Sequence, residues 1–180
     1  MSTITSIQPL LPAIAEAGRL AQHYYRHDDR LQTRLKSNRT VVTKADMAVE
    51  ALLCQAITAV FPDSNIVGEE GTSVYLPQRP YTFAIDPIDG TAAFASGAPA
   101  WAICVGMLDR AMQPIAGVVY APEWNSLFVA DVDPQSPATH NGTPLPVALE
   151  PHPIDSNTTI LIDSKLLRTH HLRNFPGKCR

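Results

Sequence analysis

The fold is decided by one stretch of the chain, Ala84-Ile85-Asp86-Pro87-Ile88-Asp89-Gly90-Thr91. Residues 81–85, which lead into the first aspartate, are mostly apolar or aromatic and predict a strand. This strand runs straight into Asp86 and Asp89, so both carboxylates are expected to project into a crevice from a rigid support. We therefore expect a functional site where the strand ends.

The two aspartates are expected to bind a hard cation. Asp86 and Asp89 lie so close in the chain that their carboxylates repel each other unless a positive charge neutralises them. Pro87 fixes its own φ angle and stiffens the segment, and the backbone carbonyl of Ile88 offers a further oxygen ligand. Because oxygen ligands favour Mg²⁺ or a similar ion, the segment predicts a magnesium site.

The residues that follow the aspartates suit an anion. Glycine at position 90 permits a close approach to the backbone, and a helix that begins here would direct free N–H groups outward. The N–H groups of Gly90, Thr91 and Ala92 therefore predict a phosphate cradle beside the metal ligands. For an isolated Asp-x-x-Asp-Gly, the alternative is a turn that only caps a helix.

Two other segments weaken that alternative. Gly68-Glu69-Glu70-Gly71 follows a short apolar strand predicted at residues 65–67 and suits a second acidic loop, although solvated surface charge is the alternative for this segment alone. Thr43-Lys44-Ala45-Asp46 opens a helix predicted to end before Pro62, and simple capping of that helix is its alternative. The order and spacing of the three segments together favour a shared site.

The remaining patterns predict the fold class α+β passing into α/β. We expect residues 1–145 to form an N-terminal α+β part that binds metal and carries catalysis. Residues 146–180 are expected to begin a C-terminal α/β part. The expected elements are two amphipathic helices at 7–24 and 47–60, strands at 65–67, 81–85, 101–108, 114–120, 126–130 and 158–162, a hairpin turn at Asn141-Gly142, and a short helix at 164–172.

Composition argues against several classes of protein. Of the 180 residues 45% are hydrophobic, which is enough for a core. The net charge of −3 gives no indication of a nucleic-acid polymer as partner. No apolar run is long enough to span a membrane, and the first residues lack the pattern of a signal peptide. The cysteines share no Cys-x-x-Cys spacing and are interpreted as reduced thiols of a cytoplasmic protein.

The segments together resemble the inositol monophosphatase family, the Mg²⁺-dependent, lithium-sensitive phosphatases of small phosphate monoesters. Residues 42–50 are similar to its VTxAD…E segment, residues 67–70 to its IGEE segment, and residues 84–96 to its signature. The resemblance covers nearly the whole chain and implies the layered αβαβα sandwich of the family. Because no segment like the family's W-D-x-A-A follows Arg180, we expect the C-terminal part of the fold to be truncated.

The resemblance also implies roles for single residues. The metal ligands would be the carboxylates of Glu69, Asp86 and Asp89 and the carbonyl of Ile88. Asp46 would pair with Thr91 to activate the attacking water, and Glu70 would be an outer acid of the catalytic set. The phosphate would be held by the N–H groups of Gly90, Thr91 and Ala92. One departure is Ala92-Ala93, where the family usually has a polar pair.

The function implied is Mg²⁺-dependent hydrolysis of a small phosphate monoester, such as inositol monophosphate, by a metal-activated water. Two alternatives stay open: a 3′(2′),5′-bisphosphate nucleotidase type of phosphatase, and a truncated, non-catalytic remnant that binds metal or a partner. The expected partner is a small phosphorylated substrate, with neither nucleic acid nor membrane involved. Association into a homodimer is a further open alternative, because the last predicted strand would present an unpaired edge.

Overall fold

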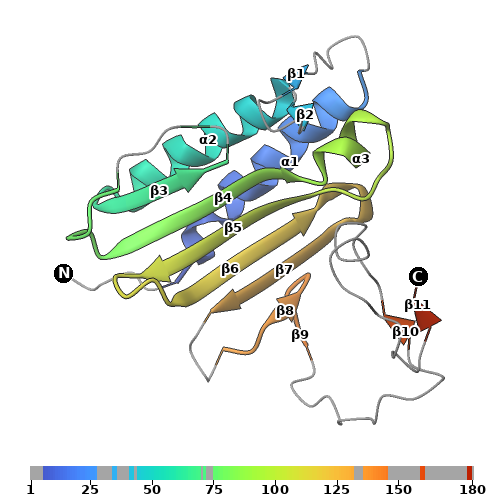
Figure 1. Ribbon diagram of the computed structural model, residues 1–180. Coiled ribbons are helices and arrows are strands. Elements are labelled where there is room, and N and C mark those ends of the chain that lie inside the picture. Colours follow the sequence, from blue (N-terminus) through green and yellow to red (C-terminus); the bar gives the residue numbers. More distant parts are fainter. Residues whose placement is uncertain are drawn as a thin grey trace. The chain divides into compact units, whose positions relative to one another are not determined.

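The computed structural model describes residues 6–27, 34–35, 41–42, 44–69, 71, 75–131, 136–145, 159–160 and 178–179. The chain divides into two compact units, Met1–Leu145 and Pro146–Arg180. Among the described residues, the first unit contains two long helices, a short third helix, a seven-stranded mixed sheet and a separate pair of strands, and the second contains one short pair of strands (Figure 1). The catalytic role expected for the first part and the α/β character expected for the second stay predictions.

Two long helices form one layer of the first unit. A 3₁₀ turn at Gln8–Leu10 leads into α1 (Leu11–Tyr25), and α2 covers Lys44–Val60. Pro12 stands in the first turn of α1, where a missing N–H removes no helical hydrogen bond. Both predicted helices are confirmed, whereas the cap expected at Thr43 lies outside the described residues. Their buried faces contain Ile14, Ala17, Gly18 and Ala21 of α1 and Ala45, Asp46, Val49, Glu50, Leu53 and Ile57 of α2.

The second layer is a seven-stranded sheet in the order β3-β4-β5-β6-β7-β8-β9. Strands β3 and β4 are parallel, and every other pair is antiparallel. A separate antiparallel pair, β1 (Arg34–Leu35) and β2 (Val41–Val42), precedes α2. The strands of the large sheet are β3 (Ser64–Gly68), β4 (Tyr81–Asp89), β5 (Ala102–Asp109), β6 (Pro114–Ala121), β7 (Ser126–Asp131), β8 (Thr139–His140) and β9 (Thr143–Pro144).

The hydrophobic core lies between the sheet and the helices, which cover one face of it (Figure 1). Alternate residues of the central strands enter this core, as period-2 alternation requires; they include Phe83, Ile85, Ile103, Val105, Met107 and Val118. The intervening residues form the other face, here called the open face. Asp86, Cys104, Val119, Phe128 and His140 are direct neighbours in one row across it, from β4 to β8.

Turn chemistry closes the predicted hairpins. Asn141 and Gly142 both have positive φ, 49° and 78°, as a two-residue turn between β8 and β9 requires.

In the second unit, β10 (Thr159–Ile160) pairs in parallel with β11 (Lys178–Cys179). The strand expected at 158–162 is therefore confirmed in its central residues, and the helix expected at 164–172 lies outside the described residues.

Candidate metal and phosphate site

Strand β4 is longer than the sequence predicts. It continues through Asp89 instead of ending at Ile85, so both aspartates are strand residues. Pairing with β5 places Asp86 opposite Cys104 and Asp89 opposite Ala102. Three steps along β4 thus match two steps along β5, which defines a β-bulge.

The bulge determines where the two carboxylates point. In a regular strand, residues three apart project from opposite faces of the sheet. Directly paired residues share a face, and Cys104 and Ala102 are two apart on β5, so their partners Asp86 and Asp89 share a face as well. Pro87 lies within the bulge, a position where a residue without an N–H is tolerated. The irregularity therefore brings both acids to the open face.

Asp86 is the most perturbed acid of the site. Burial raises the pKa of this carboxyl to about 7, with further increases from the charges of Glu69 and Asp89 and from a hydrogen bond with Glu69. A hydrogen bond from the backbone N–H of Ile88 lowers the pKa of Asp86. The Oδ1 atom of Asp86 is buried and has no hydrogen-bond partner. A buried, unpaired carboxylate oxygen is costly unless a cation or another donor satisfies it.

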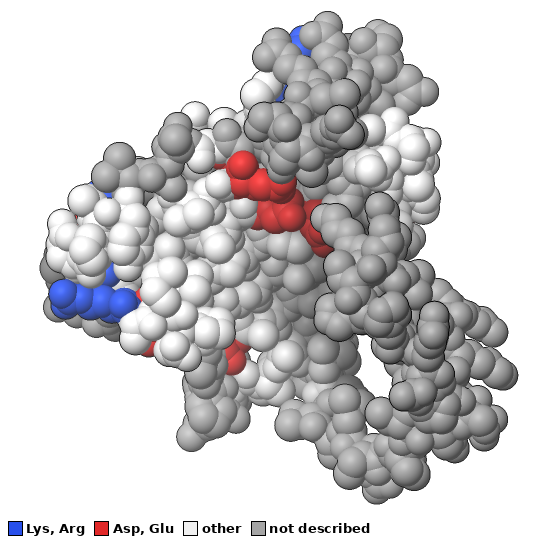
Figure 2. Space-filling view, in the orientation of Figure 1, with Lys and Arg blue, Asp and Glu red and all other residues white. Residues whose placement is uncertain are grey.

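Glu69 reaches the same place from β3. Parallel pairing sets Gly68, the last residue of β3, beside Ile85 of β4, so the residue after the strand lies next to Asp86. A pocket of about 430 Å³ includes both acids among its lining residues, which are Val67, Gly68, Glu69, Ala84, Ile85, Asp86, Cys104 and Gly106. We call this pocket of about 430 Å³ the acidic pocket. Figure 2 shows acidic side chains gathered together on the open face. The neighbouring Glu70 lies outside the described residues.

Asp46 and Thr91 meet although they are 45 residues apart. The Thr91 hydroxyl lies 3.3 Å from Oδ1 of Asp46 and 3.0 Å from the carbonyl oxygen of Ile88, and it can donate to either. Asp46 is completely buried on the first turn of α2, so its side chain is held by the core. The structure therefore brings together the catalytic pair expected from the sequence, and one of its members also contacts the Ile88 carbonyl.

Gly90 begins the short helix α3 (Thr91–Ala95) with a φ of 90°. A Cβ at this position would lie 2.7 Å from the carbonyl oxygen of Ala100, so both conformation and space require glycine. Because α3 contains only five residues, its dipole is small. Any affinity for phosphate would come from the individual N–H groups of residues 90–92.

One residue of this region was given no role from the sequence. Glu50 lies on α2 and is 7% exposed. Its carboxyl group packs against Gly68 and Gly71, the glycines before and after Glu69-Glu70 in the chain. A Cβ on Gly68 would lie 2.4 Å from Oε1 of Glu50, and a Cβ on Gly71 would lie 2.8 Å from it. The signal that could have found Glu50 is its place four residues after Asp46, one helical turn along the same buried face.

The donor set fits a hard cation in its chemistry. Among the described residues no group of three or more His, Cys, Asp or Glu side chains is arranged to hold a metal ion. The acids nevertheless offer oxygen ligands only, and one of those oxygens is buried without a partner. The residues therefore suit Mg²⁺ in ligand type.

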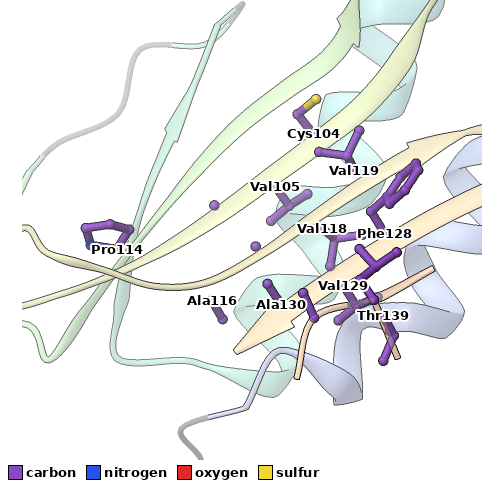
Figure 3. Close-up of a pocket in the computed structure, with 14 residues that line it drawn as sticks. Cys104, Val105, Pro114, Ala116, Val118, Val119, Phe128, Val129, Ala130 and Thr139 are labelled. Atoms are coloured by element: carbon purple, nitrogen blue, oxygen red, sulfur yellow. The ribbon is translucent and has the colours of Figure 1, made fainter. Parts of the chain in front are cut away.

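A second pocket, of about 460 Å³, also lies over the open face (Figure 3). It is lined mainly by apolar and small residues of β5–β7, among them Val119, Phe128 and Ala130, with Ala138, Thr139 and Leu145 beside them, and contains no acid. We call it the apolar pocket. It shares Cys104 and Gly106 with the acidic pocket, but only the acidic pocket has the carboxylate oxygen atoms that a metal ion needs.

In the part of the chain that the structure describes, no helix is both long enough and apolar enough to cross a membrane.

Known proteins resemble the chain in both sequence and fold. The Nus factor SuhB of Pasteurella multocida is 34% identical over 129 residues, which cover 69% of this chain and 48% of that protein. The inositol-1-monophosphatase of Synechocystis sp. is 35% identical over 129 residues, covering 72% of this chain and 41% of that protein. The crystal structure of extragenic suppressor protein suhB from Bartonella henselae has a TM-score of 0.77 at 25% identity, covering 86% and 58% of the two chains.

These similarities confirm the family and the fold expected from the sequence. The chain spans about half the length of the curated relatives it matches. The sequence profile described as the inositol monophosphatase family matches residues 5–178. This family consists of phosphoric monoester hydrolases that generally depend on a metal ion and act on small phosphorylated substrates. The chain belongs to the inositol monophosphatase family.

Proposed function

We propose that the protein hydrolyses a small phosphate monoester, such as inositol monophosphate, with Mg²⁺ as its cofactor. The observation that carries this proposal is the Oδ1 atom of Asp86, which is buried without a partner in a pocket that also contains Glu69. A carboxylate oxygen in this condition lacks a cation or donor. The proposal thus assigns to the acidic pocket the metal chemistry of the family.

Four groups would hold the metal: the carboxylates of Glu69, Asp86 and Asp89 and the carbonyl oxygen of Ile88. When bound, Mg²⁺ supplies charge neutralisation at the phosphoryl oxygens and lowers the pKa of water. The bulge of β4 supports this assignment because it gives Asp86 and Asp89 the same face. We propose that Glu70 contributes as an outer acid of the same loop.

Asp46 and Thr91 would orient the attacking water. The Thr91 hydroxyl has one proton, so when it donates to Oδ1 of Asp46 its lone pairs are free to accept a hydrogen bond from water. Burial of Asp46 holds this acceptor in place. The pair would therefore hold the water in line with the phosphorus atom and accept its proton as the new bond forms.

The phosphate would be bound by backbone N–H groups of Gly90, Thr91 and Ala92. The first N–H groups of a helix have no partner within the helix, which supports this role. The substitution of two alanines for the family's polar pair at 92–93 leaves those N–H groups unchanged. Binding of phosphate here would not require a charged side chain.

The named relatives differ in the alcohol part of the substrate. Relatives are named inositol-1-monophosphatase, histidinol-phosphatase and 3′(2′),5′-bisphosphate nucleotidase CysQ. These names share a small phosphate monoester and differ in the group that carries it. We place inositol monophosphate first and a bisphosphate nucleotide second, and we propose a cytoplasmic protein.

Release of phosphate from each of these three substrate classes, with Mg²⁺ and with EDTA, tests the proposal. The purified chain should release phosphate only with Mg²⁺, and Asp86→Asn should remove that release. The substrate with the highest kcat/KM identifies the class. If the wild type releases phosphate from all three substrates no faster than Asp86→Asn does, the proposed activity is overturned. The alternative of a non-catalytic metal-binding protein is then favoured.

A further inference from the structure

We infer that Glu50 is a positioning residue of the acidic pocket, because its carboxyl group packs against Gly68 and Gly71, which stand on either side of Glu69 in the chain. This inference rests on the proposed function, since it concerns the same metal site. The observations that carry it are the burial of Glu50 and the glycines packed against it. Glu50 does not itself line the acidic pocket, whereas Glu69 and Asp86 do.

The two glycines show how tightly the loop follows this carboxyl group. A Cβ on Gly68 would lie 2.4 Å from Oε1 and 2.6 Å from Oε2 of Glu50, closer than real Cβ contacts. A Cβ on Gly71 would lie 2.8 Å from Oε1. Both positions are therefore open only to glycine while Glu50 stays in place. The carboxyl group thus contacts the loop on either side of Glu69.

The chemistry of the contact indicates what holds it. A buried carboxylate requires hydrogen-bond donors, and the backbone at Gly68 and Gly71 packs directly against this one. We assign backbone N–H groups of these two glycines as its partners. Because α2 is anchored by core residues such as Leu53 on the same face, Glu50 links the loop to a rigid element.

The consequence concerns the distance between two proposed ligands. Asp86 is fixed by β4, but Glu69 stands one residue beyond the end of β3. Its position relative to Asp86 therefore depends on the loop. If Glu50 holds the loop, then its removal separates the two carboxylates and weakens metal binding, although neither ligand is changed. Partners that orient metal ligands typically contribute about 10–100-fold to metal affinity.

Calorimetric titration of the purified chain with Mg²⁺, together with urea unfolding in EDTA, tests the inference. Glu50→Ala should weaken Mg²⁺ binding by about 10–100-fold, and Glu50→Gln, which keeps the volume but replaces one acceptor by a donor, by about 10-fold. Leu53→Ala is the matched control, because it removes a buried side chain of the same helix. It should lower the urea midpoint and leave the Mg²⁺ affinity unchanged.

A pair of glycine variants makes the test independent of stability alone. Gly68→Ala should weaken Mg²⁺ binding, and the double variant with Glu50→Ala should bind no more weakly than Glu50→Ala alone, because the methyl group fills the vacated space. Gly117→Ala, where a Cβ would lie 3.8 Å from its nearest neighbour, should have no effect.

Each outcome decides between the hypotheses. Wild-type Mg²⁺ affinity in both Glu50 variants, or equal losses in Glu50→Ala and Leu53→Ala, would overturn the positioning role. Asp86→Asn is titrated in parallel to test the metal site itself. If Asp86→Asn binds Mg²⁺ as well as the wild type, the proposed function is wrong. If Asp86→Asn loses binding and the Glu50 variants do not, only the positioning role is wrong.

Discussion

The acidic and the apolar pocket differ in chemistry far more than in size. Their volumes are about 430 and 460 Å³, they lie over the same face of one sheet, and they share Cys104 and Gly106. One contains Glu69 and Asp86, whereas the other contains only apolar and small side chains and Thr139. The comparison teaches that the shape of a cavity does not identify a site here; the unpaired oxygen of Asp86 does.

The difference arises from the irregular geometry of a single strand. Around Val119 and Phe128 the pairing of β5, β6 and β7 is regular, and alternation places both residues on the open face. The bulge of β4 breaks this alternation and adds a second acid, Asp89, beside Asp86. The predictions below test whether the two pockets are as separate in function as they are in chemistry.

The largest effect is expected from Asp86→Asn. This change keeps the volume of the side chain but removes the charge that a divalent cation requires, so Mg²⁺ affinity should fall by at least about 100-fold. Val119→Ser, on the same cross-strand row but in the apolar pocket, is the control and should bind Mg²⁺ as the wild type does. Isothermal calorimetry measures both, and equal affinities in the two variants would contradict the division between the pockets.

The next effect concerns catalysis rather than binding. Thr91→Ala should lower kcat by about 100-fold, in the range of general acid–base contributions, and change Mg²⁺ affinity by less than about threefold. The reason is that the Thr91 hydroxyl contacts Asp46, is proposed to orient the attacking water and is not among the proposed metal ligands.

Asp46→Ala provides the partner measurement for this pair. Because the two residues act as a unit, the double variant should lose no more kcat than the more affected single variant. Losses that multiply would indicate that Thr91 and Asp46 act separately. An unchanged kcat in Thr91→Ala would remove the pair from the mechanism.

A smaller, graded effect is expected from pH. Since the pKa of Asp86 is about 7 without metal, Mg²⁺ must displace a proton at lower pH. Its affinity should rise about tenfold per pH unit below 7 and level off above it. Calorimetry between pH 5 and pH 8 in the wild type and Asp86→Asn measures this slope. A flat profile in the wild type would show that Asp86 binds Mg²⁺ without losing a proton.

The stability of the metal-free chain should move in the opposite direction. The folded pKa of Asp86 lies above its ordinary value of 3.8, so the folded state binds the proton more tightly than the unfolded state does. This contribution is complete below about pH 4 and is lost as the pH rises toward 7. Asp86→Asn cannot ionise here and should lack this component in urea unfolding curves measured in EDTA.

The sequence predicts the helices and hairpins well and the site only in outline. Apolar spacing locates both helices, and Asn141-Gly142 locates a turn, because these signals are local. The end of β4 was predicted wrongly, since a bulge depends on the pairing of Asp86 and Asp89 with another strand. The contact between Glu50 and Gly68 depends on how α2 packs against the end of β3, so spacing alone does not reveal it.

The smallest effect is expected in the apolar pocket. Phe128 and His140 are paired across β7 and β8, with ring centroids 4.5 Å apart and an interplanar angle of 10°. Because the Phe128 side chain is 40% exposed, its truncation leaves no large cavity. Phe128→Ala should therefore lower the free energy of unfolding by about 1 kcal/mol, the size of a cross-strand aromatic contact.

Urea unfolding of Phe128→Ala, His140→Ala and the double variant measures the contact directly. The two single losses should overlap, so that the double variant is less destabilised than their sum. Mg²⁺ affinity is titrated in the same three proteins and should equal that of the wild type, because neither ring reaches the acidic pocket. A fall in affinity beyond about threefold in Phe128→Ala would show that the row from Asp86 to His140 couples the two pockets, and their separation would be wrong.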